Sequence, residues 1–313
     1  MSIGFISSPA CAGHEMGDGH PECPARLDAI RDQLLSSGID FVLRHFDAPA
    51  ATREQLERVH DPDYVASIFE RAPETGIERL DPDTCMNPGS LDAALHAAGA
   101  VISAVDRVMA GEVPSAFCAV RPPGHHAERD KAMGFCLFNN IAIGAAHARG
   151  HFGLQRVAIV DFDVHHGNGS EDFVKGRDGY LLCSSFQSPF YPFTGTGELP
   201  GNIINSPLEA GAGGAELRRL VEETWLPALD DFQPQMLFVS AGFDGHREDD
   251  MAQLRFVEDD YRWVTERIRE VADRHADGRI VSALEGGYAL SALGRSVVAH
   301  LQGLIGANSS HPV

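Results

Sequence analysis

The sequence lacks paired cysteines and long apolar runs. Its six cysteines are scattered without a Cys-x-x-Cys motif, so we expect neither a disulfide framework nor a cysteine-ligated zinc site. No apolar run approaches the ~20 residues that span a bilayer, and the first residues lack a basic stretch followed by an apolar core. These absences predict a cytoplasmic protein with reduced thiols and no membrane partner.

Basic residues are scarce as well. The chain has 25 Lys and Arg against 45 Asp and Glu, which gives a formal net charge of −20. Such a charge repels nucleic acid and anionic membranes and attracts cationic ligands. An acidic surface that only keeps the protein in solution is the simpler interpretation, so the net charge alone does not establish a cationic ligand.

Internal repeats, low-complexity tracts and linker-like segments are also absent, which favours one domain over residues 1–313. Short β-branched runs alternate with stretches of helical periodicity, the pattern of a parallel α/β sheet with helices on both faces. The 90–110 helix begins at Ser90, a candidate N-cap. Strands are expected at 2–7, 41–46, 116–120, 156–163, 180–186, 235–241 and 279–284. Helices are expected at 24–37, 53–59, 62–71, 90–110, 139–150, 213–231, 257–275 and 289–305.

The segment VDFDVHHGNG (160–169) places charged side chains directly after an apolar run. In an extended segment residues two apart share a face, so Asp161, Asp163 and His165 should project together. Two carboxylates and an imidazole are typical of half a divalent-metal site, and zinc accepts oxygen and nitrogen ligands. The alternative is that the carboxylates cap the following helix and the histidines belong to a hydrogen-bond network.

A further carboxylate ends the apolar run in SAGFDGH (240–246). Alone, Asp244 is more typical of a turn or an N-cap. Beside the first cluster it supplies a third ligand, and Asp163, His165 and Asp244 then form an Asp₂His site with room for a water and a substrate oxygen. Two carboxylates formally neutralise the metal, so its water should be only modestly acidified and the site needs a nearby base.

Candidate bases lie in RPPGHHAERDKAMGF (121–135), where a Pro-Pro-Gly turn presents His125 and His126 in tandem. The alternative is a solvated surface pair. Asp161 can accept a hydrogen bond from one imidazole and Asn168 from the other. A carboxylate partner raises a histidine's pKa, whereas an amide orients the ring without charging it. One histidine would therefore be an electrostatic group and the other a neutral general base.

The segment ALEGGY (283–288) follows the last expected strand. Gly286 and Gly287 allow the backbone to approach a ligand, and the Tyr288 hydroxyl can donate to a carbonyl oxygen that becomes negative. The alternative for Tyr288 is a packing residue at the rim. Because parallel strands end at one edge of the sheet, all four clusters should meet there. Together they favour metal-assisted hydrolysis of an amide or a similar acyl group.

These segments, with GHPECPARL, LDPDTCMNPGS and YPFTGTGE, cover nearly the whole chain, and the sequence resembles the histone deacetylase superfamily. The closest likeness is to its class II-like branch of bacterial deacetylases and acetylpolyamine amidohydrolases. The resemblance implies an arginase-like open α/β fold with an eight-stranded parallel sheet and one zinc ion per chain. It also implies a zinc-dependent amidohydrolase that removes acetyl, or another short acyl group, from acyl-lysine-like amines or from acetylpolyamines. The oligomeric state stays open.

The resemblance also implies roles for individual residues. Asp163, His165 and Asp244 resemble the zinc ligands. His126 resembles the general base, His125 its electrostatic neighbour, and Tyr288 the residue that polarises the carbonyl. Asp161 and Asn168 resemble the groups that orient the histidines, and Asn at the second place is the class II-like pattern.

The family further implies a substrate tunnel and a second ion. The residues that resemble its tunnel and rim are Asp83, Gly134, Phe135, Phe190, Tyr191, Met251 and Gly287. Asp83 would grip backbone amides of the substrate, and either Phe190 or Tyr191 would be the second aromatic wall. The residues that match a monovalent-cation site, expected to hold potassium, are Asp161, Asp163, His165 and Ser184.

Other functions are weighed against this one. Met251 stands where polyamine-selective relatives carry Glu, and no long dimerisation loop is inserted, which weakens a strict polyamine assignment. An arginase-type ureohydrolase needs a second Mn²⁺ and further Asp ligands that these motifs do not supply. A non-catalytic acyl-lysine or polyamine binding protein would not need the intact histidine pair and Tyr288. A phosphohydrolase with a D-x-D nucleophile would need a phosphate-binding loop, which is missing.

Overall fold

The computed structural model describes residues 2–306, and its centre is an eight-stranded sheet in which every pairing is parallel. The strand order is β2-β1-β5-β10-β9-β6-β7-β8. The strands are β1 (Ile3–Ser7), β2 (Leu43–Asp47), β5 (Ser115–Cys118), β6 (Val157–Asp161), β7 (Tyr180–Gln187), β8 (Ile203–Leu208), β9 (Met236–Ala241) and β10 (Ile280–Leu284). A separate antiparallel pair is formed by β3 (Glu78–Arg79) and β4 (Cys85–Met86). The predicted eight-stranded parallel sheet is confirmed.

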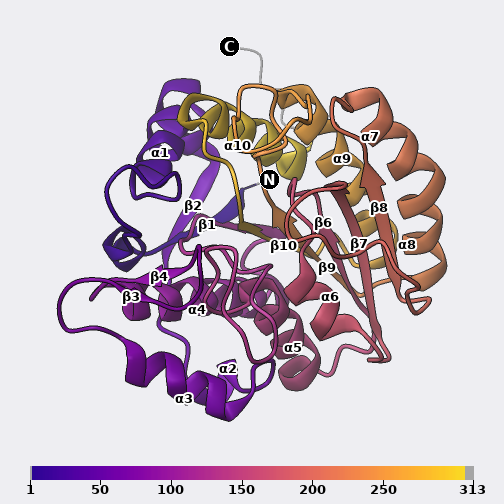
Figure 1. Cartoon of the computed structure of the whole chain (residues 1–313). Helices are drawn as coiled ribbons and strands as arrows, with labels where there is room; N and C mark the ends of the chain where they lie inside the picture. The colour runs from indigo at the N-terminus through magenta and orange to yellow at the C-terminus, as the bar shows by residue number, and fades with distance from the viewer. Residues whose placement is uncertain (1, 307–313) are drawn as a thin grey trace.

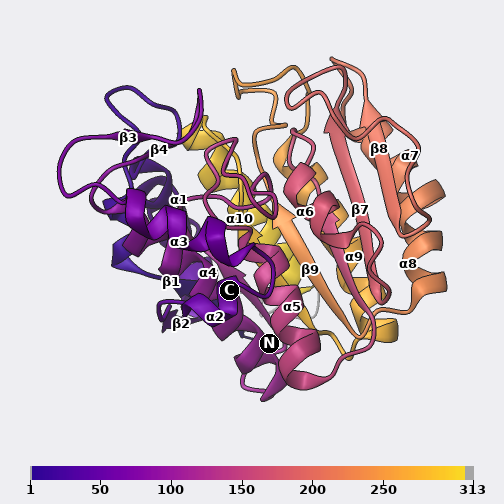
Figure 2. The same cartoon turned by 60° about the horizontal axis from the view of Figure 1, so that its bottom comes forward.

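Helices cover both faces of this sheet (Figures 1 and 2). One layer contains α1 (Ala25–Ser37), α10 (Leu290–Ile305) and α9 (Glu258–His275), with α7 (Gly214–Leu220) and α8 (Leu226–Phe232) beside α9. The other contains α4 (Ser90–Met109), α5 (Asn140–Phe152) and α6 (Asn168–Val174). Two further helices are α2 (Arg53–Leu56) and α3 (Pro62–Arg71). Single turns of 3₁₀ helix span Pro9–Gly13 and Ile39–Val42, and a π-helical turn, Val221–Trp225, joins α7 to α8. Within residues 2–306, no helix has both the length and the apolar character needed to cross a bilayer.

The hydrophobic core lies between the sheet and these helix layers. All residues of β6, β9 and β10 are buried, which explains why their sequences are continuous apolar runs without a polar alternation. On α4 the stripe of alanines from Ala93 to Ala104 is buried against the sheet and α5. Small side chains there let the helix pack closely on the sheet.

Several local features differ from the sequence prediction. The β3–β4 pair was not predicted, and the helix expected at 53–59 ends at Leu56. The edge strand β8 was missed because its sequence, IINSPL, is half-polar and contains Pro207. The seven-residue helix α6 was missed because it begins inside the glycine-containing polar cluster. Ser90 was wrongly expected to be the N-cap of α4: Gly89 occupies that position, and Ser90 Oγ instead accepts from Asn87 N at 2.8 Å and lies 2.7 Å from His14 Nδ1.

Four strands that are adjacent at the centre of the sheet, β5, β10, β9 and β6, lead into the polar clusters. The histidine pair follows β5, the Gly-Gly-Tyr segment follows β10, Asp244 follows β9, and the two-aspartate segment follows β6. Since all four strands run in the same direction, these clusters lie side by side at one edge, where open α/β sheets bind ligands.

Candidate functional site

Three side chains from the ends of β6 and β9 converge on one point. Asp163, His165 and Asp244 each offer a ligand atom, and these atoms lie within 4.8 Å of one another. His165 Nδ1 is 3.1 Å from Asp163 Oδ1 and 3.2 Å from Asp244 Oδ2. One ring nitrogen carries at most one hydrogen and can make at most one well-directed hydrogen bond to these two carboxylates. Asp244 Oδ2 is a buried oxygen with no hydrogen-bond partner among the described residues. A divalent cation fits this set of oxygen, nitrogen and oxygen donors.

The surrounding backbone fixes the two carboxylates. Asp163 accepts from Gly286 N at 2.8 Å and from His165 N at 2.9 Å, and Asp244 Oδ1 accepts from Val164 N at 3.1 Å. A Cβ atom at Gly286 would lie 2.0 Å from Asp244 Oδ2 and 2.7 Å from Asp163 Oδ2, so only glycine allows this strand end to approach both carboxylates. Each carboxylate is thus held in place by at least one backbone amide.

The tandem histidines lie beside this triad, each with a different partner. His125 Nδ1 is 2.9 Å from Asp161 Oδ2, and His126 Nδ1 is 2.7 Å from Asn168 Oδ1. The two ring centroids are 4.1 Å apart, and the His126 ring packs edge-on against His165 at 5.8 Å. Asp161 is therefore the partner of His125 and Asn168 the partner of His126, an assignment that the sequence alone left open.

The two partners give the histidines opposite charge preferences. Burial alone would lower the pKa of His125, but the carboxylates of Asp161 and Asp163 outweigh it and hold that pKa well above the usual range. Burial lowers the pKa of His126, and the positive charge of His125 lowers it further. These surroundings therefore favour the charged form of His125 and the neutral form of His126.

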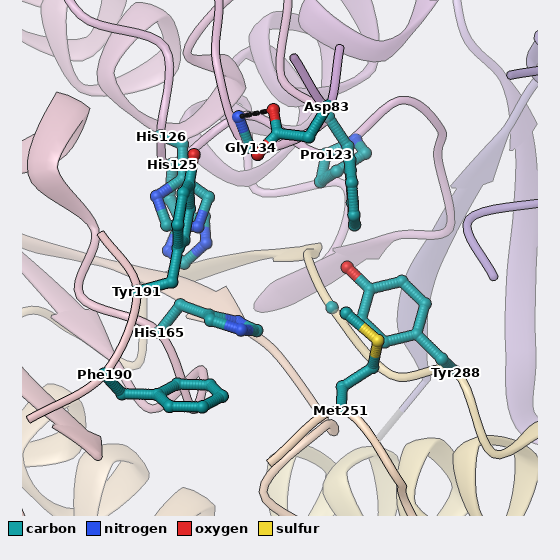
Figure 3. A pocket seen from close by; sticks show the side chains of 12 residues that line it. Asp83, Pro123, His125, His126, Gly134, His165, Phe190, Tyr191, Met251 and Tyr288 are labelled. Carbon is teal, nitrogen blue, oxygen red and sulfur yellow. Dashed lines mark hydrogen bonds between the residues drawn. The ribbon is translucent and has the colours of Figure 1, made fainter. Parts of the chain in front are cut away.

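A cavity of about 220 Å³ is lined by the tandem histidines and by His165 of the triad (Figure 3). In the figure His126 and His165 lie on one side of it and Tyr288 and Met251 on the other. Its lining residues are Asp83, Pro123, His125, His126, Gly134, Phe135, His165, Phe190, Tyr191, Met251, Gly286 and Tyr288. A narrow, largely apolar cavity with a few polar groups at its base suits a linear chain that ends in a polar group.

Both aromatic candidates for the second wall line this cavity. Phe190 stacks on His165, with ring centroids 5.4 Å apart and planes at 23°, whereas Tyr191 meets His126 edge-on at 5.4 Å. On the opposite side Phe135 packs edge-on against Tyr288 at 6.0 Å. Thus Phe190 covers the metal-site histidine and Tyr191 covers the histidine paired with the amide.

Gly287 and Asp83, both expected to contact substrate, differ from the other predicted contact residues in their surroundings. Gly287, predicted to contact substrate, does not line the cavity; its carbonyl oxygen accepts from Arg26 Nε at 2.7 Å, and Gly286 lines the cavity instead. Asp83 lies at the rim, but its Oδ1 already accepts from Gly134 N at 3.1 Å and Thr84 Oγ1 at 3.0 Å. The hydrogen bonds to Gly134 and Thr84 fix the Asp83 carboxylate at the rim.

Sequence reasoning missed the groups that hold the Tyr288 loop. Asp249 Oδ2 accepts from Tyr288 N at 2.6 Å and Ala289 N at 2.9 Å, at the start of α10. The Arg26 guanidinium lies over the Tyr288 ring, 5.0 Å from its centroid. Burial raises the pKa of Tyr288 well above its ordinary value, so the hydroxyl stays protonated and can donate a hydrogen bond.

A buried ion cluster anchors Arg26. Glu22 accepts from Arg121 through both carboxylate oxygens, each at 2.5 Å, and from Arg26 Nη1 at 3.1 Å. Burial opposes the charge of Glu22, but Arg121 outweighs it and the pKa falls to about 2. The sequence indicates this pair only through the four-residue spacing of Glu22 and Arg26. That spacing is also typical of exposed ion pairs on surface helices, so it does not reveal that these side chains are buried.

Glu285 was also missed, because nothing in the sequence around it indicates that its carboxyl is buried. It follows β10 and is fully buried, and its Oε2 accepts from Gly124 N at 2.7 Å and His125 N at 3.1 Å. Its other oxygen accepts from Ser240 Oγ at 3.2 Å. Burial raises the pKa of Glu285 to about 7. This carboxyl joins the end of β10 to the turn that presents the tandem histidines.

The residues expected to hold a monovalent ion also lie together. Asp161 and Ser184 are register partners on β6 and β7, and Ser184 Oγ is buried without a hydrogen-bond partner in the described part of the chain. Asp161 Oδ1 accepts from Asp163 N at 3.1 Å, which places this pair directly behind the triad. The unpaired hydroxyl oxygen is a potential ligand for a hard cation.

Comparison with known proteins gives concordant matches. The sequence matches the model of the histone deacetylase domain over residues 20–304. It is 37% identical over 311 residues to the histone deacetylase-like amidohydrolase of Pseudomonas aeruginosa, covering 96% of this chain and 80% of that protein. It is 34% identical to polyamine deacetylase HDAC10 of Mus musculus, covering 91% of this chain and 45% of the mouse protein. A crystal structure of the HDA15 HD domain superposes with a TM-score of 0.91 at 30% identity, covering 99% of this chain and 92% of that one.

Proposed function

The chain belongs to the histone deacetylase family and is an amide hydrolase, and from this premise we propose that it uses zinc to remove acetyl, or another short acyl group, from acyl-lysine-like amines. The observation that carries the proposal is that His126 and His165, the histidine of the Asp163–His165–Asp244 triad, line the same narrow cavity, opposite Tyr288. We further propose that residues 1–313 form one catalytic domain.

Asp163, His165 and Asp244 would hold the zinc ion. Asp244 Oδ2, which has no hydrogen-bond partner among residues 2–306, and the close approach of three ligand atoms support this assignment. When bound, zinc supplies Lewis acidity, which polarises an amide carbonyl and makes a nearby water more acidic. Ser184, Asp161, Asp163 and His165 would hold a potassium ion behind it.

The chain's own residues would then move the protons. Because His126 Nδ1 is bonded to Asn168 Oδ1, Nε2 is the nitrogen left to accept a proton from the attacking water. As water adds, the amide carbonyl oxygen becomes negative and receives a hydrogen bond from the Tyr288 hydroxyl. The C–N bond breaks when protonated His126 returns its proton to the leaving amine. His125, kept cationic by Asp161, adds positive potential beside the developing oxyanion.

The cavity walls support a linear aliphatic substrate. Phe190, Tyr191, Phe135 and Met251 would enclose the methylene chain of an acyl-lysine, and Gly134 leaves room beside the His126 ring. Asp83 at the rim would bind a polar group of the carrier. A second candidate substrate is an acetylated polyamine, because the net charge of −20 attracts polycations and one relative is named a polyamine deacetylase.

The test is amine release from an acetyl-lysine peptide by the zinc-loaded protein, with and without a chelator. Chelator-sensitive release is the expected result. Release from acetylputrescine under the same conditions, with none from the peptide, would assign the polyamine substrate instead. If neither substrate is hydrolysed, and peptides that carry other short acyl groups on lysine are not hydrolysed either, the proposed deacylase activity is refuted and a binding function takes its place.

A further inference from the structure

The side-chain amide of Asn168 is held on both sides. Its Oδ1 faces His126 Nδ1 at 2.7 Å, and its Nδ2 lies 2.6 Å from Glu128 Oε1. The same Nδ2 is 3.3 Å from the His126 carbonyl oxygen and 3.2 Å from Met133 Sδ. Glu128 belongs to the loop that carries the histidine pair, two residues beyond His126, and none of the roles assigned above includes it.

The chemistry of these partners determines which way the amide points. A carboxylate oxygen and a backbone carbonyl oxygen only accept hydrogen bonds, so the side of Asn168 that faces Glu128 must be the NH₂ group. The carbonyl oxygen of Asn168 is therefore turned toward His126. At 2.6 Å, the bond to Glu128 is the shortest that this NH₂ group makes.

The amide orientation in turn fixes the tautomer of His126. Since Asn168 Oδ1 can only accept, His126 Nδ1 must carry the hydrogen, and Nε2 is left with its lone pair. A flipped amide would present NH₂ to His126, draw the lone pair to Nδ1 and place the proton on Nε2. A ring in that state has no nitrogen free to take a proton in the cavity.

The loop around Glu128 is itself anchored. The Glu128 carbonyl oxygen accepts from His60 Nδ1 at 2.9 Å, and His60 Nε2 accepts from Asn139 N at 2.9 Å. Glu128 N donates to Lys131 O at 3.0 Å. His60 is buried, so the backbone that carries the Glu128 carboxylate is fixed relative to α5.

We propose that Glu128 is a positioning residue that keeps Asn168 in one orientation and thereby maintains His126 as the Nδ1–H tautomer, with Nε2 free as the proton acceptor. The proposal rests on the assignment of His126 as general base in the proposed function, but it makes a statement about the tautomer that is measurable without turnover.

Three variants test it. Glu128→Lys puts a donor where the acceptor was and should flip Asn168. We expect kcat to fall by about 100-fold, the size of a general-base contribution, with KM within about threefold of wild type. Glu128→Gln keeps a carbonyl acceptor and should stay within about threefold in kcat. Glu128→Lys combined with Asn168→Asp should recover kcat to within about tenfold, because a carboxylate accepts both from the introduced lysine and from His126.

The control is Asp130→Lys, which makes the same charge change two residues later, on the exposed part of the loop, and should leave kcat unchanged.

The second readout is the ring-nitrogen ¹⁵N spectrum of His126, assigned by its loss in His126→Ala. The wild type, Glu128→Gln and the double variant should show hydrogen on Nδ1, and Glu128→Lys should show it on Nε2. If folded Glu128→Lys keeps the Nδ1–H tautomer, or keeps kcat within threefold, the proposal is overturned. If the wild type hydrolyses no amide, the proposed function fails, yet the spectra still decide whether Glu128 sets the tautomer.

Discussion

Replacing Glu22 by Gln should destabilise the protein substantially and slow the reaction, although Glu22 lies outside the cavity. The substitution removes the carboxylate that Arg121 and Arg26 share, and all three side chains are buried. Gln offers one acceptor oxygen, and its NH₂ group faces guanidinium donors. Because Arg26 holds the Gly287 carbonyl and lies over the Tyr288 ring, the disturbance reaches the reacting edge of the sheet.

The size of the effect follows from the pKa of Glu22. A fall from 4.5 to about 2 is about 2.5 units, which corresponds to ~3 kcal/mol of folding stability at neutral pH. Removing one partner of a buried ion pair independently costs about 3–5 kcal/mol. We therefore expect Glu22→Gln to lower the free energy of unfolding by ~3–5 kcal/mol and Tm by roughly 5–8 °C.

The pH dependence of this contribution has a definite sign. A carboxyl whose pKa is lower in the folded state stabilises fully above its unfolded pKa and loses that contribution as pH falls toward its folded pKa. The difference between wild type and Glu22→Gln should thus be constant from pH 8 to about 5.5 and smaller by ~0.8 kcal/mol at pH 4.

Urea unfolding of the chelator-treated wild type and variant at pH 7 and pH 4 measures the loss of unfolding free energy and its change with pH. The chelator removes any contribution from metal release. Glu15→Gln, an exposed position in the same segment, is the control and should change stability by less than about 0.5 kcal/mol. A free energy of unfolding of the variant within about 1 kcal/mol of wild type at pH 7, or a difference that grows as pH falls from 7 to 4, would contradict this prediction.

Three further substitutions probe the reacting groups. Tyr288→Phe should lower kcat by about 10²- to 10³-fold with zinc content unchanged by elemental analysis, and loss of zinc would contradict its role as a hydrogen-bond donor. Asp244→Asn removes the charge of an oxygen that has no donor among the described residues, so zinc affinity measured by chelator competition should fall by more than about tenfold; unchanged affinity would place the ion elsewhere. Asp249→Ala leaves the amides of Tyr288 and Ala289 without their acceptor, and kcat should fall by about tenfold with KM nearly unchanged, whereas a pure KM effect would show that Asp249 serves substrate binding.

The parts of the fold that could be predicted from the sequence are those with strong periodicity. Apolar runs such as 235–241 located the central strands within one or two residues, because a strand buried on both faces must be apolar on both. The edge strand Ile203–Leu208 faces solvent on part of its surface, so its half-polar pattern carried no such signal. The prediction of Ser90 as an N-cap was wrong because its hydroxyl is buried and hydrogen-bonds to Asn87 N and His14 Nδ1 instead of to the first turn of the helix.

The candidate site could be predicted only where neighbouring residues in the sequence are also neighbours in space. The period of two in VDFDVHHGNG was enough to group Asp161, Asp163 and His165. Glu22 and Arg121 are 99 residues apart, and nothing in either segment indicates that the other will neutralise it. Their pairing depends on how the segment before α1 packs against the end of β5, which is a property of the assembled layers.

The strand order explains why so many charges can be buried at one edge. The chain reaches the four central strands in the order β5, β6, β9 and β10, but the sheet arranges them as β5, β10, β9 and β6. The Gly-Gly-Tyr loop after β10 is thereby inserted between the histidine turn after β5 and Asp244 after β9. Glu285 and Gly286, adjacent in sequence, then hold the histidine turn and the Asp163 carboxylate respectively. Each carboxylate of this edge is thus matched by an amide, a guanidinium, an imidazole or the proposed cations, and the triad oxygen that has no donor within residues 2–306 lies where the proposed zinc ion would bind.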